Sequence, residues 1–156
     1  MGKLLNINYI EYSPATKSLD LFVAGCNKPH CKDCCNPELL DFHNGQEWHS
    51  WRDTIEGYFG RFDSLIDNIF LLGGSFNHQD ENAVKEILSY LSFYNKKIWL
   101  FAREDLAKIQ PAFKEYCDYI KCGAYIPDLY TTKNIQEGVR LATSNQKIYQ
   151  KGKDYV

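Results

Sequence analysis

The chain has 156 residues, of which 44% are hydrophobic and 15% are aromatic. A chain of this length and composition can fill one hydrophobic core, so we expect a single domain over residues 1–156. The 18 Lys and Arg are nearly balanced by 20 Asp and Glu, and the formal net charge of -2 excludes an overall field that attracts nucleic acid or an anionic membrane. No secretory signal is recognised at the N-terminus, and no segment approaches the roughly 20 apolar residues of a membrane span, so we expect a cytoplasmic protein.

The first elements predicted along the chain are two β-prone runs at residues 6–12 and 19–24, separated by the turn-forming sequence Ser-Pro-Ala-Thr. The second run leads directly into Gly25 and Cys26. From Cys26 to about Gly45 the chain is polar and rich in Asn, Pro and Cys, which is typical of a loop whose shape is set by a ligand.

Helices and strands alternate after this loop. The apolar spacing predicts helices at residues 48–62, 81–93 and 106–116, the last interrupted at Pro111, and strands at 68–72, 97–102 and 119–125. This alternation predicts an α/β fold with a mostly parallel sheet, whose ligands bind beyond the carboxyl ends of the strands. Residues 128–156 are mostly polar and are expected to form an ordered lid or a loose tail.

The loop carries four of the six cysteines within ten residues. Cys26, Cys31 and Cys34 have the spacing C-x4-C-x2-C, so their thiols can reach one centre, and thiolates are the soft ligands that zinc and iron–sulfur clusters prefer. The spacing leaves both kinds of centre open. A structural zinc site needs a fourth ligand, for which His30, Cys35, Cys117 and Cys122 are the candidates. Cys117 and Cys122 are otherwise expected to be small buried residues.

Three motifs carry a resemblance to a known family. The sequence LFVAGC runs into the three cysteines, and Asn36 stands two residues after the last of them. Residues 71–75 (LLGGS) occupy the place of an LLGG(E/D) turn, and residues 141–147 (LATSNQK) are similar to a Ser-Asn-Gln-Arg ending. The chain resembles the activating proteins of anaerobic ribonucleoside-triphosphate reductase, a branch of the radical S-adenosylmethionine (SAM) superfamily. It departs from them by one extra residue between Cys26 and Cys31, by Asp33, and by Ser75 in place of an acidic residue.

The resemblance implies a small, partly open radical SAM (βα) barrel. It also implies a [4Fe–4S] cluster on Cys26, Cys31 and Cys34, with one iron left for the amino and carboxylate groups of SAM. The residues that the resemblance places against SAM are Asp33, Cys34, Cys35, Gly73 and Gly74. The resemblance assigns no general acid or base, and His30 is expected to be a solvated loop residue.

The activity that the resemblance implies is reductive cleavage of SAM, with a reductant such as flavodoxin supplying the electron. The resulting 5′-deoxyadenosyl radical generates a glycyl radical on the large subunit of the anaerobic reductase. Two other functions stay open at this point. One is a radical SAM enzyme that acts on a small molecule such as a modified-nucleobase precursor, and the other is a non-enzymatic zinc-binding interaction module.

Overall fold

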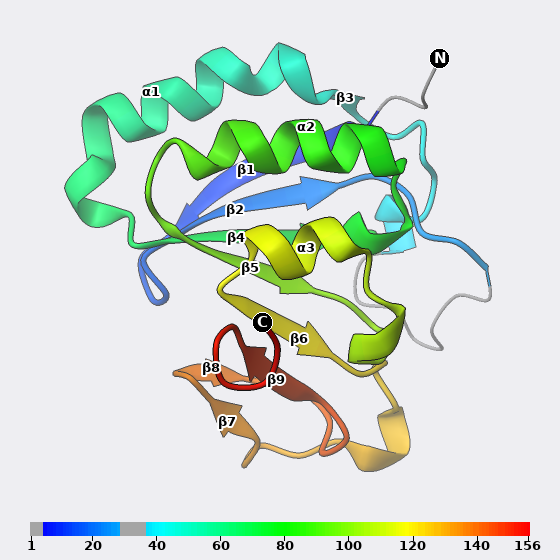
Figure 1. Cartoon of the computed structure of the whole chain (residues 1–156). Coiled ribbons are helices and arrows are strands. Elements are labelled where there is room, and N and C mark those ends of the chain that lie inside the picture. Colours follow the sequence, from blue (N-terminus) through cyan, green and yellow to red (C-terminus); the bar gives the residue numbers. More distant parts are fainter. Residues whose placement is uncertain (1–4, 29–36) are drawn as a thin grey trace.

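The computed structural model describes residues 5–28 and 37–156, which form a seven-stranded sheet with helices on one face (Figure 1). The order of the strands across the sheet is β3-β1-β2-β4-β5-β6-β9. Their bounds are β1 Asn6–Ser13, β2 Ser18–Val23, β3 Gln46–Glu47, β4 Asn68–Gly73, β5 Lys97–Phe101, β6 Tyr119–Cys122 and β9 Lys147–Gln150. A separate hairpin joins β7 (Ile135–Gln136) to β8 (Val139–Arg140).

The central strands β2, β4, β5 and β6 are parallel, and antiparallel strands flank them on both sides. The predicted α/β fold with a mostly parallel sheet is therefore confirmed. Within the described residues the sheet ends at β3 and β9, so these strands form an open sheet and not a closed barrel. Because the carboxyl ends of parallel strands meet at one edge, β2, β4, β5 and β6 deliver their following loops to the same place.

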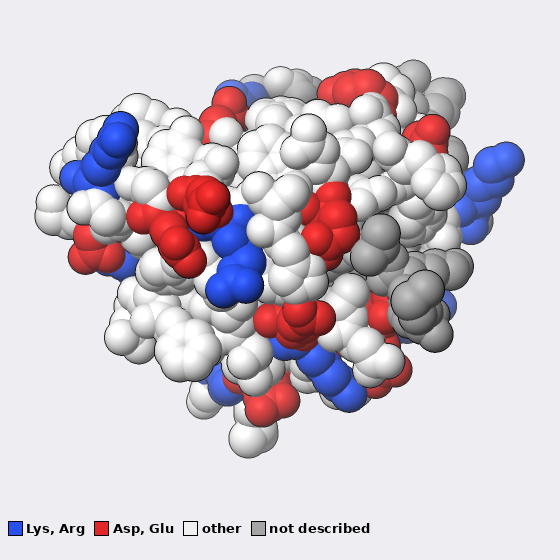
Figure 2. Space-filling view, turned by 90° about the horizontal axis from the view of Figure 1, so that it is seen from above, with Lys and Arg blue, Asp and Glu red and all other residues white. Residues whose placement is uncertain are grey.

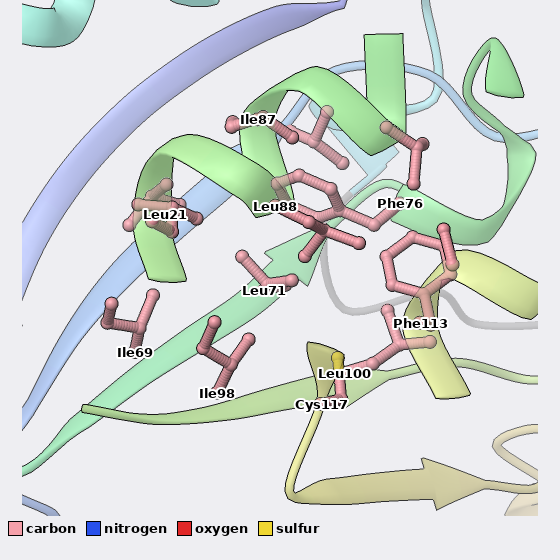
Figure 3. Close-up of a cluster of buried hydrophobic side chains, with 14 of the residues drawn as sticks. Leu21, Ile69, Leu71, Phe76, Ile87, Leu88, Ile98, Leu100, Phe113 and Cys117 are labelled. Atoms are coloured by element: carbon pink, nitrogen blue, oxygen red, sulfur yellow. The ribbon is translucent and has the colours of Figure 1, made fainter. Parts of the chain in front are cut away.

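Three helices cover one face of the sheet: α1 (Arg52–Phe62), α2 (Glu81–Ser92) and α3 (Pro111–Tyr116). The helical spacing of the apolar residues in α2 explains its packing. These residues lie on one side of the helix and are fully buried: Val84, Ile87, Leu88 and Leu91. Asp80 begins this helix, and its carboxylate accepts a hydrogen bond from the Ala83 amide at 3.2 Å. Figure 3 shows how α2 and α3 pack on β4 and β5 in this main core.

The opposite face of the sheet carries a second, smaller core of aromatic residues. Phe70, Trp99 and Tyr119 lie side by side across β4, β5 and β6 in register, and each is almost fully buried. Leu141 and Ile148 from the C-terminal segment complete the cluster. The polar segment after residue 128 is therefore an ordered part of the fold, and β9 within it pairs antiparallel with β6.

Two predicted boundaries differ from the structure. The segment Trp48–Trp51 is a 3-10 helix that precedes α1, and Phe62 at the end of α1 is 45% exposed and not packed on the sheet. Strand β6 ends at Cys122, earlier than predicted, because Gly123 has φ +107°, a conformation that bends the chain away from the sheet.

The surface over α1 and α2 has no field of a single sign. Acidic and basic side chains are interspersed there (Figure 2), which agrees with the near-neutral net charge. No helix in residues 5–28 and 37–156 combines the length and the hydropathy that crossing a bilayer requires.

Candidate functional site

A pocket of about 480 Å³ lies at the carboxyl ends of the parallel strands. Its first wall consists mainly of residues at and just after the ends of β2, β4 and β5, and its second wall comes from β6 and the C-terminal segment. The lining residues of the first wall are Cys26, Leu40, Leu72, Gly73, Gly74, Ser75, Phe101, Ala102 and Arg103. Those of the second wall include Lys121, Tyr125, Tyr130, Val139, Arg140, Leu141, Ala142 and Gln146.

Cys26 is placed by the end of β2 and is buried at the rim of this pocket. The Gly25 amide donates to the Leu39 carbonyl at 2.8 Å, and the Cys26 amide donates to the Leu40 carbonyl at 3.2 Å. These two bonds hold residues 25–26 beside residues 39–40, so the two ends of the segment 26–39, called the cysteine loop from here on, lie next to each other. The predicted ligands Cys31 and Cys34, together with Asp33, Cys35 and His30, lie outside the described residues.

Gly73 and Gly74 form the turn after β4 and line the same pocket as Cys26. Close packing against neighbouring backbone explains why both positions are glycine. Gly73 has φ +107°, and a Cβ there would lie 2.6 Å from the Val23 nitrogen; a Cβ on Gly74 would lie 2.5 Å from the Leu39 carbonyl oxygen. The glycines therefore let the β4 turn approach the backbone on both sides of the cysteine loop, whatever they do toward a ligand.

Ser75 occupies the position where the resemblance predicts an acidic residue. Its amide donates to the Gly25 carbonyl at 2.8 Å, which ties the turn to the residue before Cys26. Its Oγ atom is buried and has no hydrogen-bond partner within the part of the chain that the structure describes. An orphaned buried hydroxyl in a pocket wall is a place where a ligand can supply the missing bond.

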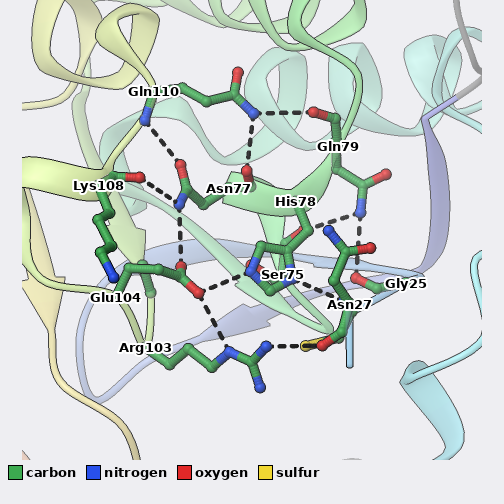
Figure 4. Close-up of polar contacts among 12 residues, drawn as sticks. Gly25, Asn27, Ser75, Asn77, His78, Gln79, Arg103, Glu104, Lys108 and Gln110 are labelled. Atoms are coloured by element: carbon green, nitrogen blue, oxygen red, sulfur yellow. Dashed lines mark hydrogen bonds and ion pairs between the residues drawn. The ribbon is translucent and has the colours of Figure 1, made fainter. Parts of the chain in front are cut away.

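A ring of hydrogen bonds closes on the backbone of Asn27, the residue that follows Cys26 (Figure 4). The Asn27 amide donates to His78 Nδ1 at 2.8 Å, and the Asn27 carbonyl accepts from Arg103 Nη2 at 2.7 Å. Glu104 closes the ring, since its Oε2 accepts from His78 Nε2 at 2.7 Å and from Arg103 Nε at 3.2 Å. This ring was not predicted from the sequence, because its residues lie in separate segments of the chain. Each of these segments follows the end of a predicted strand.

The hydrogen bonds of the ring shift the pKa values of Glu104 and His78. Burial disfavours the Glu104 carboxylate, but hydrogen bonds from His78 and Asn77 outweigh burial and lower the pKa of Glu104 to about 2. Hydrogen bonds to Cys26 and Glu104 raise the pKa of His78 to about 9. The Asn27 amide acts against this shift, because an amide can only donate and needs Nδ1 as an acceptor. The neutral ring with its proton on Nε2 is the form that satisfies both the amide and Glu104.

Two cationic side chains and a C-terminal loop shape the rest of the pocket. Lys121 Nζ donates to the carbonyls of Ala102 and Gly123, at 3.3 and 3.0 Å, which fixes this ammonium group beside Arg103 in the lining. Gln146 is buried in the opposite wall, where its Oε1 accepts from the Thr143 amide at 3.1 Å. Of the Ser-Asn-Gln motif, Gln146 thus forms part of the pocket wall.

The remaining cysteines behave as core residues. Cys117 and Cys122 belong to the main hydrophobic core, and burial raises the pKa of both thiols, that of Cys122 to about 11. The expectation that they are small buried residues is confirmed.

The fold and the site define an α/β protein in which a cysteine loop and a glycine turn meet at a pocket on the carboxyl edge of a parallel sheet. A family model described as a 4Fe-4S single cluster domain matches residues 16–149. The chain therefore belongs to this iron–sulfur family. A comparison with curated proteins found no match.

Proposed function

We propose that this protein is a radical SAM activase, which holds a [4Fe–4S] cluster on Cys26, Cys31 and Cys34 and generates a glycyl radical on an anaerobic ribonucleotide reductase. The observation that carries the proposal is that Cys26 and the Gly73–Gly74 turn line one pocket. The family match supports the cluster, and the three motifs of the sequence support the choice of chemistry. A small, partly open radical SAM barrel is the corresponding proposal for the fold.

The surroundings of Cys26, the proposed ligand that lies within the described residues, support the cluster proposal. Cys26 follows the end of the buried strand β2. Backbone hydrogen bonds hold Gly25 and Cys26 beside Leu39 and Leu40, so the chain that leaves at Cys26 comes back to the same place at Leu39. Three thiolates leave one iron open, and SAM bound there supplies an alkyl radical once the cluster is reduced. The protein's contribution is to hold the ligands, shape the pocket and exclude water.

The pocket also fits SAM in size and polarity. A volume of about 480 Å³ falls in the range of about 300–1,000 Å³ that is typical of small-molecule sites. Ser75 Oγ is available as an acceptor for an ammonium group, and Lys121 and Arg103 bring positive charge for a carboxylate. Apolar groups such as Phe101, Leu72 and Val139 line much of the remaining surface, which suits an adenosyl group.

The proposal is tested with anaerobically reconstituted protein, SAM and a chemical reductant or flavodoxin. We expect a brown protein that cleaves SAM slowly, and a stable glycine-centred electron paramagnetic resonance signal on the reductase when it is added. Stoichiometric turnover of a small molecule without any reductase would favour the small-molecule alternative. A colourless protein that retains zinc and leaves SAM intact would favour the zinc-binding module.

A further inference from the structure

We propose that His78, held by Glu104, is a positioning residue that fixes the peptide after Cys26 and thereby orients and tunes this cluster ligand. The inference rests on the proposed role of Cys26 as a ligand. It concerns residues that no motif of the sequence singled out: His78 after β4 and Glu104 after β5.

The first argument is geometric. Both backbone polar atoms of Asn27 are taken, because its amide donates to His78 and its carbonyl accepts from Arg103. The amide of Asn27 belongs to the peptide group that joins it to Cys26, so the orientation of this group helps set the direction of the thiol. The three elements that meet here follow β2, β4 and β5, and Figure 4 shows them converging on Asn27.

The second argument is that the ring is rigid. The side chains of His78 and Glu104 are only 10% and 15% exposed. Glu104 accepts three hydrogen bonds, from His78, from Arg103 and from Asn77 Nδ2 at 3.0 Å. A buried and fully paired polar network holds its members in place, and a histidine fixed through a carboxylate keeps one tautomer.

The third argument concerns the chemistry of the thiolate. Hydrogen bonds to the sulfur atoms of an iron–sulfur cluster help set its reduction potential. In the structure the Asn27 amide is committed to His78 Nδ1 and is withheld from the neighbouring Cys26 sulfur. Removing the imidazole frees this amide and also removes the hydrogen bond between His78 and Cys26, so the hydrogen bonds at the sulfur change and the midpoint potential shifts.

The test compares cluster-loaded parent protein with His78→Ala, His78→Asn and His78→Gln. The amide oxygen of Asn lies near the place of Nδ1 and keeps an acceptor for Asn27, whereas the end of Gln lies near Nε2 and reaches Glu104. We expect His78→Ala to lose cluster iron to a chelator about 10-fold faster and to shift the midpoint potential and the electron paramagnetic resonance signal. His78→Asn should restore both properties more fully than His78→Gln.

His49→Ala is the matched control, because His49 also lies between two carboxylates, those of Glu47 and Glu86, and is exposed on the surface. It should match the parent in both measurements. Glu104→Gln keeps the size of the side chain and should give a smaller shift in the same direction, so it carries the test if His78→Ala does not fold.

The outcomes separate the inference from the proposed function. A parent protein that assembles no cluster, or a Cys26→Ala variant that keeps it, overturns the proposed cluster site and the positioning role with it. A parent that holds its cluster on Cys26, with His78 and Glu104 variants that match it in chelator resistance, potential and spectrum, overturns the positioning role alone.

Discussion

Gly74 lies so close to Gly25 that a Cβ on Gly74 would come within 2.7 Å of the Gly25 carbonyl oxygen. The same Cβ would come within 2.5 Å of the Leu39 carbonyl oxygen. Both neighbours are backbone atoms at the two ends of the cysteine loop. The glycine turn is therefore a structural support for that loop.

We predict that Gly74→Ala lowers the free energy of unfolding by about 1–3 kcal/mol and also lowers the amount of cluster per chain, because the added methyl group pushes the loop ends apart. Thermal unfolding and iron content measure the two effects. Gly57→Ala on α1 is the control, since among the described residues no atom outside the local helix backbone lies within 4 Å of its Cβ position, and it should raise stability by about 0.5–1 kcal/mol. Unchanged stability and iron in Gly74→Ala would contradict this account of the turn.

A second prediction concerns Asp20, which is buried in β2 opposite Glu11 of β1. Burial raises the pKa of Asp20 to about 6, and only the Ser18 hydroxyl, which donates to Oδ1 at 2.5 Å, acts in the opposite direction among its largest influences. A folded-state pKa above the unfolded value means that this group favours folding most below pH 4 and that the advantage is lost as the pH rises through 6.

We therefore expect Asp20→Asn to stabilise the protein at pH 7 by up to about 3 kcal/mol relative to the parent, and by little at pH 4. Denaturant unfolding of both proteins between pH 4 and pH 7.5 measures this difference. Parallel stability curves for variant and parent across that range would show that Asp20 has an ordinary pKa.

A third prediction is that alanine at Cys26, Cys31 or Cys34 removes most of the cluster and abolishes SAM cleavage, because each is one of three proposed ligands. Cys117→Ala changes a core thiol and should keep the cluster. Iron and sulfide analysis together with visible absorbance measures the effect. Retention of the cluster in Cys34→Ala with its loss in Cys35→Ala would reassign the third ligand.

The fourth prediction concerns the C-terminal wall of the pocket. Gln146→Ala leaves the Thr143 amide without its acceptor in a buried place and should cost about 1–3 kcal/mol of stability. Asn145→Ala, at an exposed position, should cost less. We expect both variants to reduce the radical yield on the reductase more than they reduce cluster content. Equal stability of the two variants would show that the Gln146 contact contributes nothing.

Periodicity was sufficient to predict the elements that pack on the main core. Strands at 6–12, 19–24 and 68–72 and the helix at 81–93 are confirmed within one or two residues, because their apolar positions repeat over several turns or pleats. The interruption at Pro111 is also confirmed, since α3 begins at that residue.

Short elements held by tertiary contacts were not predicted. Strand β9 has only four residues, and it depends on pairing with β6 and on a hydrogen bond from the Ile148 amide to the Gln136 side chain. The 3-10 helix at Trp48–Trp51 has the same apolar spacing as a first turn of α-helix.

The cysteine and glycine motifs of the candidate site could be predicted from the sequence, whereas its hydrogen-bonded ring depends on the order of the strands. The cysteine and glycine motifs located the pocket, because both follow strands whose carboxyl ends face the same edge. The ring of His78, Arg103 and Glu104 has no local signal, since a histidine after one strand meets an acidic residue after another only when the order of strands is known.

The order in which the pocket walls are synthesised follows from their place in the chain. The first wall begins at Cys26, and the last lining residue, Gln146, leaves the ribosome more than a hundred residues later, which at common translation speeds is roughly 6–24 s. During this interval a nascent chain carries Cys26 without the second wall of its pocket. Cluster insertion at that stage would meet oxygen and competing metals directly, so the fold favours delivery of iron and sulfide to the finished protein.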